Sequence, residues 1–220
     1  MSHGRTTPHA ASPRNCSDAP DVAHDQTTVT IASFTDCRDG AEEVFVGDAG
    51  LETAFRRDQV VLAVVPLGSL GPVRKAAIVR VCSDALGADC GSLFDYLTAS
   101  THVLAALDGR LVGHACWSSR QLQPVGLPPL RTAWVDAVSV GPTHQRRGIG
   151  SLVMRRLADE TADFELRALG TEQMAYFARL GWELWEGPTR GVHHDPLDSL
   201  MILRTATSPQ LDRAAPITGL

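Results

Sequence analysis

The most regular hydrophobic pattern in the chain begins at Trp134. Side chains alternate through residue 140, so one predicted face carries Val135, Ala137 and Ser139, and the other carries Trp134, Asp136, Val138 and Val140. A period of two residues is typical of a half-buried strand. After Gly141-Pro142, apolar residues follow helical spacing at Ile149, Leu152, Val153 and Leu157. The pattern therefore predicts a strand, a glycine-containing loop and a helix in direct succession.

Further strands and helices are predicted on both sides of this unit. Strands are expected at residues 59–66, 164–169, 182–185 and 200–204. Asp108-Gly109 is a turn dipeptide, so residues 102–107 and 111–118 should form a hairpin. Helices are expected at residues 72–85, 93–99 and 171–179, and a proline-rich connection at residues 123–129. Near the start, short β-branched runs lie at residues 27–33 and 44–46, and a helical turn is expected at residues 51–58.

The order of these elements predicts one main domain with appendages. Residues 1–26 are rich in Ser, Thr, Pro, His and Asp, which indicates a disordered N-terminal tail. Residues 27–58 are interpreted as an N-terminal extension, residues 59–206 as the domain and residues 207–220 as a C-terminal tail. The expected fold class is α/β (α+β), with a mixed twisted sheet of about six to seven strands and helices on both faces.

Composition and charge exclude several classes of protein. No run of about 18 apolar residues occurs and the start lacks the apolar centre of a signal peptide, so no membrane partner and a cytoplasmic location are expected. Five cysteines without a Cys-x-x-Cys pair argue against a disulfide framework and a metal site. Acidic residues outnumber basic ones by 25 to 20, which disfavours nucleic acid as a partner.

The loop between the central strand and its helix reads Gln145-Arg146-Arg147-Gly148-Ile149-Gly150. A helix N-terminus offers unpaired N–H groups and the positive end of its dipole, and glycines let an anion come close to them. The spacing differs from the phosphate loop of NTPases and from the dinucleotide fingerprint. The loop is therefore a candidate site for a phosphate-bearing ligand. The alternative is a strand-to-helix turn that binds nothing.

A Gln/Arg-x-x-Gly-x-Gly/Ala loop after a Val-rich strand resembles the pyrophosphate loop of the GNAT superfamily of N-acetyltransferases, and residues 145–150 match it throughout. The order of elements from Val60 onward is also similar to the GNAT fold. This resemblance implies acetyl-CoA as cosubstrate. The residues assigned to it are Val138, Ser139, Val140, Gln145, Arg146, Arg147, Gly148, Ile149, Gly150 and Phe177.

Within that superfamily, residues 102–190 look most like the aminoglycoside 2′-N-acetyltransferases. Residues 134–140 stand where these enzymes carry a Val-Glu/Asp-x-Val-x-Val strand, and residues 181–189 (GWELWEGPT) resemble their Gly-Trp-x-x-Trp-x-Gly-Pro-Thr segment. The resemblance implies acetyl transfer to an amine of a cationic, aminoglycoside-like amino sugar, and hence antibiotic resistance. It leaves the formation of a homodimer open.

Two residues are candidates for proton transfer. A base must accept the proton of an ammonium group, and Asp136 on the central strand matches the family position. The alternative is a carboxylate that caps the backbone or pairs with Arg131. Many GNAT enzymes use as acid a Tyr four residues before a glycine, where this chain has Phe177. Tyr176, one residue earlier, is rotated by about 100° on a helix, so it is either redirected, unneeded as an acid, or packed with its hydroxyl at the surface.

Acidic residues are expected to bind a cationic acceptor. The resemblance places this role in the loop after the first helix and in the C-terminal segment, on Asp89, Asp95, Asp195 and Asp198. It adds Asp136 and Trp185 as further substrate-binding residues. Each acid could equally be a solvated surface residue. His193-His194-Asp195 is a short cluster without a distant third metal ligand, and a loop is the preferred interpretation.

Other functions stay open at this point. A GNAT-fold module that binds acyl-CoA without catalysis is suggested by Phe177 at the position of the acid. An enzyme with a different acceptor, such as a peptide N-terminus, a lysine or another small amine, is a second alternative. Release of free thiol from acetyl-CoA when an amine is added distinguishes a catalyst from a binding module.

Overall fold

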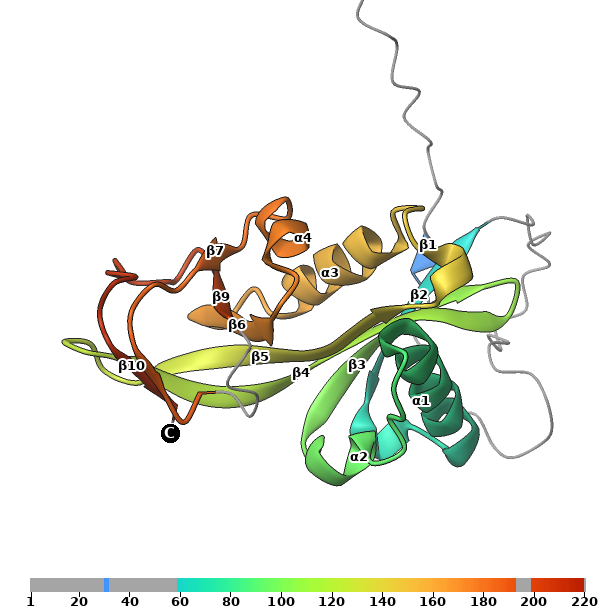
Figure 1. Cartoon of the computed structure of the whole chain (residues 1–220). Helices are drawn as coiled ribbons and strands as arrows, with labels where there is room; N and C mark the ends of the chain where they lie inside the picture. The colour runs from blue at the N-terminus through green and yellow to red at the C-terminus, as the bar shows by residue number, and fades with distance from the viewer. Residues whose placement is uncertain (1–29, 32–58, 193–198, 220) are drawn as a thin grey trace, which may run out of the picture.

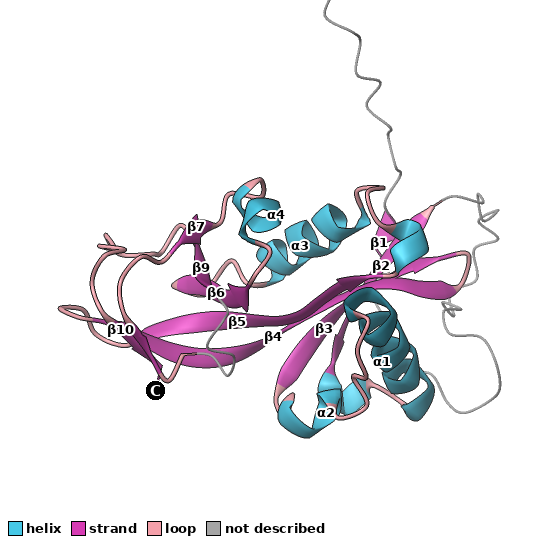
Figure 2. Ribbon diagram, viewed as in Figure 1, coloured by secondary structure: helices cyan, strands magenta, loops and turns pink. Residues whose placement is uncertain are grey.

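A computed structural model describes residues 30–31, 59–192 and 199–219 (Figure 1). Helices α1 and α2 cover one face of a central sheet, and α3 and α4 cover the other (Figure 2). The helices are α1 (Pro72–Leu86), α2 (Leu93–Tyr96), α3 (Ile149–Glu160) and α4 (Met174–Ala178), with 3-10 turns η1 (Leu67–Ser69) and η2 (Pro142–His144). The strands are β1 (Thr30–Ile31), β2 (Val60–Pro66), β3 (Ser100–Leu107), β4 (Arg110–Pro124), β5 (Leu130–Val140), β6 (Leu166–Thr171), β7 (Glu183–Leu184), β8 (Thr189–Arg190), β9 (Ser199–Arg204) and β10 (Ile217–Gly219).

The strands of the described residues form one ten-stranded sheet in the order β1-β2-β3-β4-β5-β6-β9-β7, with β10 on β4 and β8 on β10. The expected mixed sheet with helices on both faces is confirmed, and the larger strand number comes mainly from strands of two or three residues. Strands β2 to β5 are antiparallel neighbours, whereas β5 and β6 are parallel because α3 connects them. The β5–β6 pairing covers only residues 132–134 and 166–168.

The hairpin of β3 and β4 is confirmed. Asp108 and Gly109 have φ values of 50° and 74°, as a two-residue turn between twisted strands requires. Both β4 and β5 are longer than predicted, since β4 continues to Pro124 and β5 starts at Leu130. The proline-rich segment between them is a tight turn in which the Leu127 N–H donates to the Pro124 carbonyl.

The helices predicted at residues 72–85, 93–99 and 171–179 agree with the structure to different degrees. The helix expected at residues 72–85 is α1, which starts with Pro72 and ends at Gly87 in the left-handed conformation. The helix expected at residues 171–179 is shorter, because β6 extends to Thr171, whose hydroxyl accepts the Gln173 N–H. The helix expected at residues 93–99 ends at Tyr96. The predicted elements at 44–46 and 51–58 lie outside the described residues.

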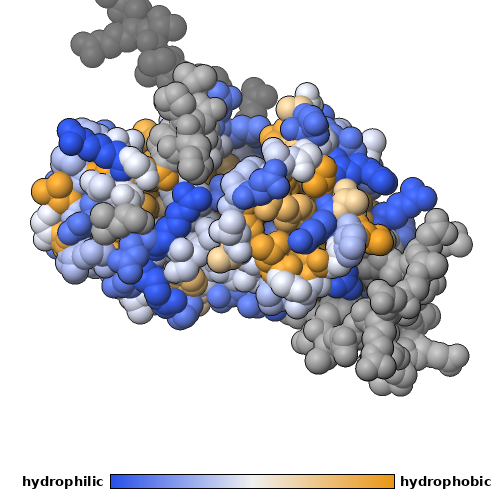
Figure 3. All heavy atoms as spheres, turned by 90° about the horizontal axis from the view of Figure 1, so that it is seen from below, coloured by the Kyte–Doolittle hydropathy of each residue, from blue (hydrophilic) through white to orange (hydrophobic). Residues whose placement is uncertain are grey.

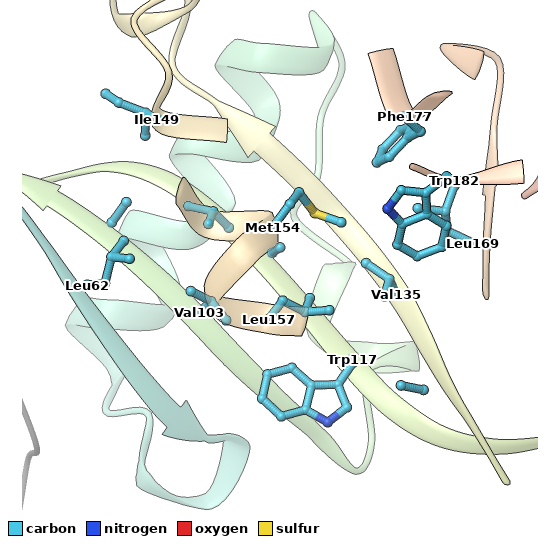
Figure 4. Close-up of a cluster of buried hydrophobic side chains, with 14 of the residues drawn as sticks. Leu62, Val103, Trp117, Val135, Ile149, Met154, Leu157, Leu169, Phe177 and Trp182 are labelled. Carbon is cyan, nitrogen blue, oxygen red and sulfur yellow. The ribbon is translucent and has the colours of Figure 1, made fainter. Parts of the chain in front are cut away.

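Three buried clusters hold the layers together. The first lies between the sheet and α3 and includes Val135, Val153, Leu157 and Phe177 (Figure 4). The second lies beneath α1 and α2 and includes Ile78, Leu93 and Leu104. The third joins β5, β6 and β9 to the C-terminal segment through Trp134, Trp185 and Ile217. The outer side of α1 is not uniformly polar, as apolar patches lie among hydrophilic residues in Figure 3 and Val73 is 64% exposed.

Residues 207–219, assigned by sequence to a C-terminal tail, pack onto the sheet. Strand β10 pairs with β4 at residues 122–124, and Ile217 is fully buried. Arg213 forms ion pairs with Glu183 and Glu186. No helix in the described part of the chain has the length and apolar character needed to cross a membrane.

A β-bulge interrupts β5 near its middle. Cys116 faces Asp136 and His114 faces Ser139, so Ala137 and Val138 together stand opposite one residue of β4. Ala137 has a φ of 53°, a left-handed conformation that L-residues other than glycine rarely adopt. The extra residue reverses the alternation of side chains beyond it.

The two-face pattern predicted for residues 134–140 is therefore wrong after Asp136. Val138 and Val140 join Val135 on the α3 side, where they pack against the first cluster. Ala137 packs against the cluster beneath α1. Ser139 moves to the α1 side together with its β4 partner His114. A one-residue insertion changes the face of every following side chain.

The strain at Ala137 can be tested by replacement with glycine. A left-handed alanine costs roughly 1–2 kcal/mol, and glycine removes this cost while it adds roughly 0.4–1 kcal/mol of unfolded-state entropy. We expect Ala137→Gly to raise the free energy of unfolding by between zero and about 1 kcal/mol, measured by denaturant titration. Destabilisation by more than about 1 kcal/mol would show that the conformation is not strained.

Candidate functional site

The loop before α3 presents an uncapped helix N-terminus to solvent. Gly148 is the N-cap residue with a φ of 80°, and no side chain of the described residues caps the helix. Residues 145–148 are exposed, while Ile149 is buried in the core. A Cβ on Gly148 would meet nothing within 4 Å, so the space above the first turn is open. These features fit an anion such as a pyrophosphate.

The residues predicted to hold a cofactor divide into two groups. Arg146, at a φ of 59°, and Arg147 are exposed and can supply positive charge at the loop. The Gln145 side-chain amide donates to the Val140 carbonyl at 3.1 Å and so ties the loop to the end of β5. Ile149 anchors the first turn of α3 in the core. We infer that these last two residues position the loop.

Tyr176 reaches from α4 to the first turn of α3. A Cβ on Gly150 would lie 2.6 Å from the Tyr176 hydroxyl and 3.5 Å from Val140 Cγ2, so glycine permits this close approach. The hydroxyl is buried near Ser151 but forms no hydrogen bond to the residues that the structure describes. Burial raises the pKa of Tyr176, and the Ser151 hydroxyl opposes this shift. The hydroxyl therefore does not lie at the surface, and it faces the loop side of β5.

Two predicted site residues are part of the core instead. Phe177 is 6% exposed and packs edge-on against Trp182, with ring centroids 5.9 Å apart (Figure 4). Trp185 is 4% exposed, and its indole N–H donates to the Ala215 carbonyl at 3.0 Å. The cofactor role of Phe177 and the acceptor role of Trp185 do not fit this placement. Both follow from burial of a large aromatic ring between elements.

Asp136 lies on the α1 side of β5, two residues beyond the last residue paired with β6. Its carboxylate lies 3.6 Å from the Arg120 guanidinium, and the two side chains are 28% and 31% exposed. Arg120 also stacks over Trp134 at 4.6 Å from the ring centroid. The pairing with Arg131 considered from the sequence is wrong, since Arg131 pairs with Asp163 at 2.9 Å.

Sequence reasoning missed two residues beside Asp136. Arg120 lies beyond the strand predicted at residues 111–118, and only the register of β4 with β5 brings it to Asp136. Tyr96 of α2 is 58% exposed. Burial of part of its ring, and then the charge of Asp136, raise the pKa of Tyr96. Helix α2 covers the same face of the sheet as α1 (Figure 2), so Tyr96 belongs to the same side of β5 as the carboxylate.

The predicted acceptor acids that the structure describes are not gathered around Asp136. The Asp89 carboxylate is exposed and accepts the Gly91 N–H at 2.9 Å, so it stabilises a turn. Asp95 is exposed in the first turn of α2. Asp195 and Asp198 lie outside the described residues. Among the predicted acids that the structure describes, only Asp136 is in contact with other polar groups of this face.

A chain of buried polar side chains connects this face to the bulge. Ser100 Oγ lies 2.9 Å from His102 Nε2, and His102 Nδ1 lies 2.9 Å from His114 Nε2. His114 Nδ1 lies 2.9 Å from the Ala137 carbonyl oxygen. Both imidazoles are fully buried. The sequence carries no signal for this pair, because each is an isolated histidine on an apolar strand.

Similarity to known proteins agrees with this arrangement. A sequence model described as the Acetyltransferase (GNAT) family matches residues 80–182. A GNAT family N-acetyltransferase from Escherichia coli, solved in complex with CoA, is 15% identical with a TM-score of 0.54, covering 77% of this chain and 93% of that one. An acyl-CoA N-acyltransferase from Pseudomonas aeruginosa is 14% identical with a TM-score of 0.50, covering 66% of this chain and 99% of that one. The domain has the GNAT fold.

One curated relative is similar in sequence. The L-2,4-diaminobutyric acid acetyltransferase of Nocardia farcinica is 31% identical over 119 residues, which cover 52% of this chain. The match spans 58% of the length of that relative. On the GNAT fold of this chain, the loop and Tyr176 lie on the α3 side of β5 and Asp136 on the α1 side. The loop with Tyr176 on one side, and Asp136 on the other, flank the part of β5 that β6 does not pair.

The buried histidines predict a loss of stability in acid. Burial lowers the pKa of His102 to about 4 and that of His114 to about 3, from an ordinary value of 6.5. In the unfolded chain both histidines therefore bind protons below about pH 6.5. In the folded chain His102 binds a proton only below about pH 4 and His114 only below about pH 3. The stabilisation is complete above pH 6.5 and is lost as the pH falls.

We expect the melting temperature to fall between pH 7 and pH 4.5, with the histidines accounting for a drop of on the order of several degrees. Calorimetry should show a smaller drop in the double variant His102→Gln/His114→Asn. His144→Gln, at the partly exposed end of η2, is the control and should keep the parent's dependence. If the melting temperature fell equally with pH in the double variant and the parent, the acid sensitivity could not be assigned to His102 and His114.

Proposed function

We propose that this protein is an acetyl-CoA-dependent N-acetyltransferase that acts on a small primary amine. The observation that carries this proposal is the arrangement around the unpaired half of β5. An uncapped helix N-terminus and a buried Tyr176 hydroxyl beside Ser151 lie on one side, and the Asp136 carboxylate lies on the other. Phosphate binding and proton acceptance are the two tasks that this transfer requires.

The residues on the α3 side fit coenzyme A. The N–H groups at the start of α3, with Arg146 and Arg147 nearby, would bind the pyrophosphate. Acetyl-CoA supplies a thioester-activated acetyl group at this site. The Tyr176 hydroxyl, which has a proton and no bonding partner among the described residues, could donate to the departing sulfur. Its buried position supports this role better than Phe177, which has no proton to give.

Asp136 fits the role of base. An amine reaches the acyl carbon only after its ammonium form has lost a proton, and a carboxylate can accept that proton directly or through water. The present contact with Arg120 does not prevent this role, because an ammonium group can replace the guanidinium as partner. A non-catalytic module would not need a carboxylate at this place.

The acceptor class has two candidates. The sequence resemblance favours an aminoglycoside-like amino sugar. The paired Asp136 and Arg120 favour instead an amine that also carries a carboxylate, because such an acceptor offers a partner to each charge. The name of the Nocardia relative, which acts on L-2,4-diaminobutyric acid, supports this second candidate. A polycation would leave Arg120 facing positive charge.

Release of thiol from acetyl-CoA tests the function directly. Amino sugars, diamino acids and simple diamines should be offered in parallel, and at least one class should give acceptor-dependent release. Asp136→Asn keeps the shape and removes basicity, so we expect turnover to fall on the order of a hundredfold while calorimetry still detects coenzyme A binding.

A matched control separates this effect from loss of an ion pair. Asp163→Asn removes the carboxylate that pairs with Arg131, another arginine stacked on an aromatic ring. This variant should keep parent turnover. Retained turnover in Asp136→Asn, or equal losses in both variants, would contradict the base assignment.

Arg120→Gln tests the acceptor class. If the acceptor bears a carboxylate, KM should rise roughly tenfold or more because a charge-assisted hydrogen bond is lost, while kcat changes little. For an amino sugar, KM should stay constant or fall. Arg131→Gln is the control with the same stacking and pairing pattern. A rise in KM for amino sugars but not for diamino acids would exclude the carboxylate-bearing acceptor.

A further inference from the structure

The hydrogen-bond chain through Ser100, His102 and His114 has only one direction. The Ala137 carbonyl can only accept, so His114 Nδ1 must carry a proton. Burial lowers the pKa of His114 to about 3, so the ring is neutral at pH 7 and its Nε2 is left as an acceptor for His102 Nδ1–H. His102 Nε2 is then an acceptor for the Ser100 hydroxyl at 2.9 Å, closer than the Leu97 carbonyl, the other acceptor near that proton, at 3.3 Å. The Cys82 sulfur, 3.8 Å from His114 Nδ1, is a weaker second contact for the same proton.

This direction argues against two other roles. Ligand atoms of His102, His114 and Cys116 all lie within 4.8 Å of one another, a spacing that could hold a metal ion. Every imidazole lone pair is already used as a hydrogen-bond acceptor, so no nitrogen is left to bind a cation. The chain also ends on a carbonyl oxygen, which cannot pass a proton on to Asp136. A fixed, neutral chain can only orient the group at its end.

The group at its end is the strained peptide of the bulge. In a regular strand, successive carbonyls point to opposite edges. Here the carbonyls of Asp136 and Ala137 both accept from β4 side chains, the first from the Cys116 thiol at 3.5 Å and the second from His114. The described peptides contain no cis bond, so the Val138 N–H points away from His114.

We propose that Ser100, His102 and His114 are positioning residues that hold the bulge of β5 and thereby place Asp136 and the Val138 amide for acetyl transfer. The inference rests on the proposed function. Its physical basis is that a left-handed alanine persists only where its surroundings determine it. The bond from His114 is the contact made by the Ala137 carbonyl, and the neighbours on β3 fix the imidazole that donates it.

The wild-type protein gives the first test, which no folding defect can obscure. Long-range proton–nitrogen correlation spectra of the full chain at pH 7 should show His102 and His114 both neutral and protonated on Nδ1. An Nε2-protonated ring at either position would overturn the proposed direction of the hydrogen bonds. One equivalent of zinc or another transition metal in the purified protein would overturn it too, because the metal needs the same lone pairs.

Two substitutions of His114 provide the second test. His114→Leu removes the donor to Ala137, and we expect kcat to fall about tenfold to a hundredfold, with the dissociation constant of coenzyme A changed less than about threefold. His114→Asn keeps a donor near the position of Nδ1 and should restore most of kcat. A purely structural role would give similar losses of stability and no rescue of kcat.

Thr132→Val is the matched control on the same strand. It removes a buried hydroxyl that donates to the Leu130 carbonyl, away from the bulge. Its kcat should stay within about twofold of the parent even if the melting temperature falls. Parent-like kcat in folded His114→Leu would overturn the positioning role. If His114→Leu does not fold, a kcat of His114→Asn no higher than a tenth of the parent overturns it.

The outcomes separate this inference from the function on which it rests. Turnover by the parent with unaffected turnover in His114→Leu rejects the positioning role alone. No turnover with any acceptor rejects the proposed function and with it the catalytic role of the chain. In either case, the tautomers of His102 and His114 in the parent protein test the direction of the hydrogen-bond chain.

Discussion

The structure depends on the unequal pairing of the two edges of β5. The edge toward β4 is paired from Leu130 to Val140, whereas the edge toward β6 is paired only at residues 132–134. A strand segment without a hydrogen-bonded neighbour on one edge is normally less ordered, because its backbone N–H and C=O groups form hydrogen bonds with water instead. Here buried clusters on both faces hold the unpaired half in place, with Val135 on one side and Ala137 on the other. An extended ligand can therefore add to a strand that is already rigid.

That rigidity has a local cost at the bulge. The left-handed Ala137 is unfavourable by roughly 1–2 kcal/mol. Carbonyl bonds from His114 and Cys116 offset part of it, and the extra residue brings Val138 and Val140 to the α3 side. The strand can then present its carboxylate to the α1 face and apolar side chains to the α3 face. Regular alternation would put Asp136 and Val138 on the same face.

Elements with local signals were predictable from the sequence, and elements set by distant contacts were not. Asp108-Gly109 and the Pro72 start of α1 need only nearby residues, and both predictions are confirmed. The bulge carries an alanine where a glycine would have signalled a positive φ. The loop at residues 145–150 was found by its glycines. The partners of Asp136 were not found, because the β4–β5 register alone brings Arg120 beside it.

Aromatic residues show the same limit. Trp185 lies in a segment that resembles a family motif, yet its burial follows from β10 and residues 211–217, which sequence patterns placed outside the domain. Phe177 occupies the inner side of α4, and its neighbour Tyr176 is turned toward Gly150. A short helix cannot show a hydrophobic period, so its orientation comes only from packing.

The charges around Asp136 connect the fold to the choice of acceptor. Two arginines of this sheet each stack on an aromatic ring and pair with an aspartate, Arg120 with Asp136 and Arg131 with Asp163. The Arg131 pair is shorter but more exposed, so water can replace either partner at little cost. The Asp136 pair is longer and less exposed, so a ligand that takes its carboxylate must leave Arg120 with a new partner. Under the proposed function, an acceptor with both an ammonium and a carboxylate group offers a partner to each member of the pair, whereas one with ammonium groups alone offers none to Arg120.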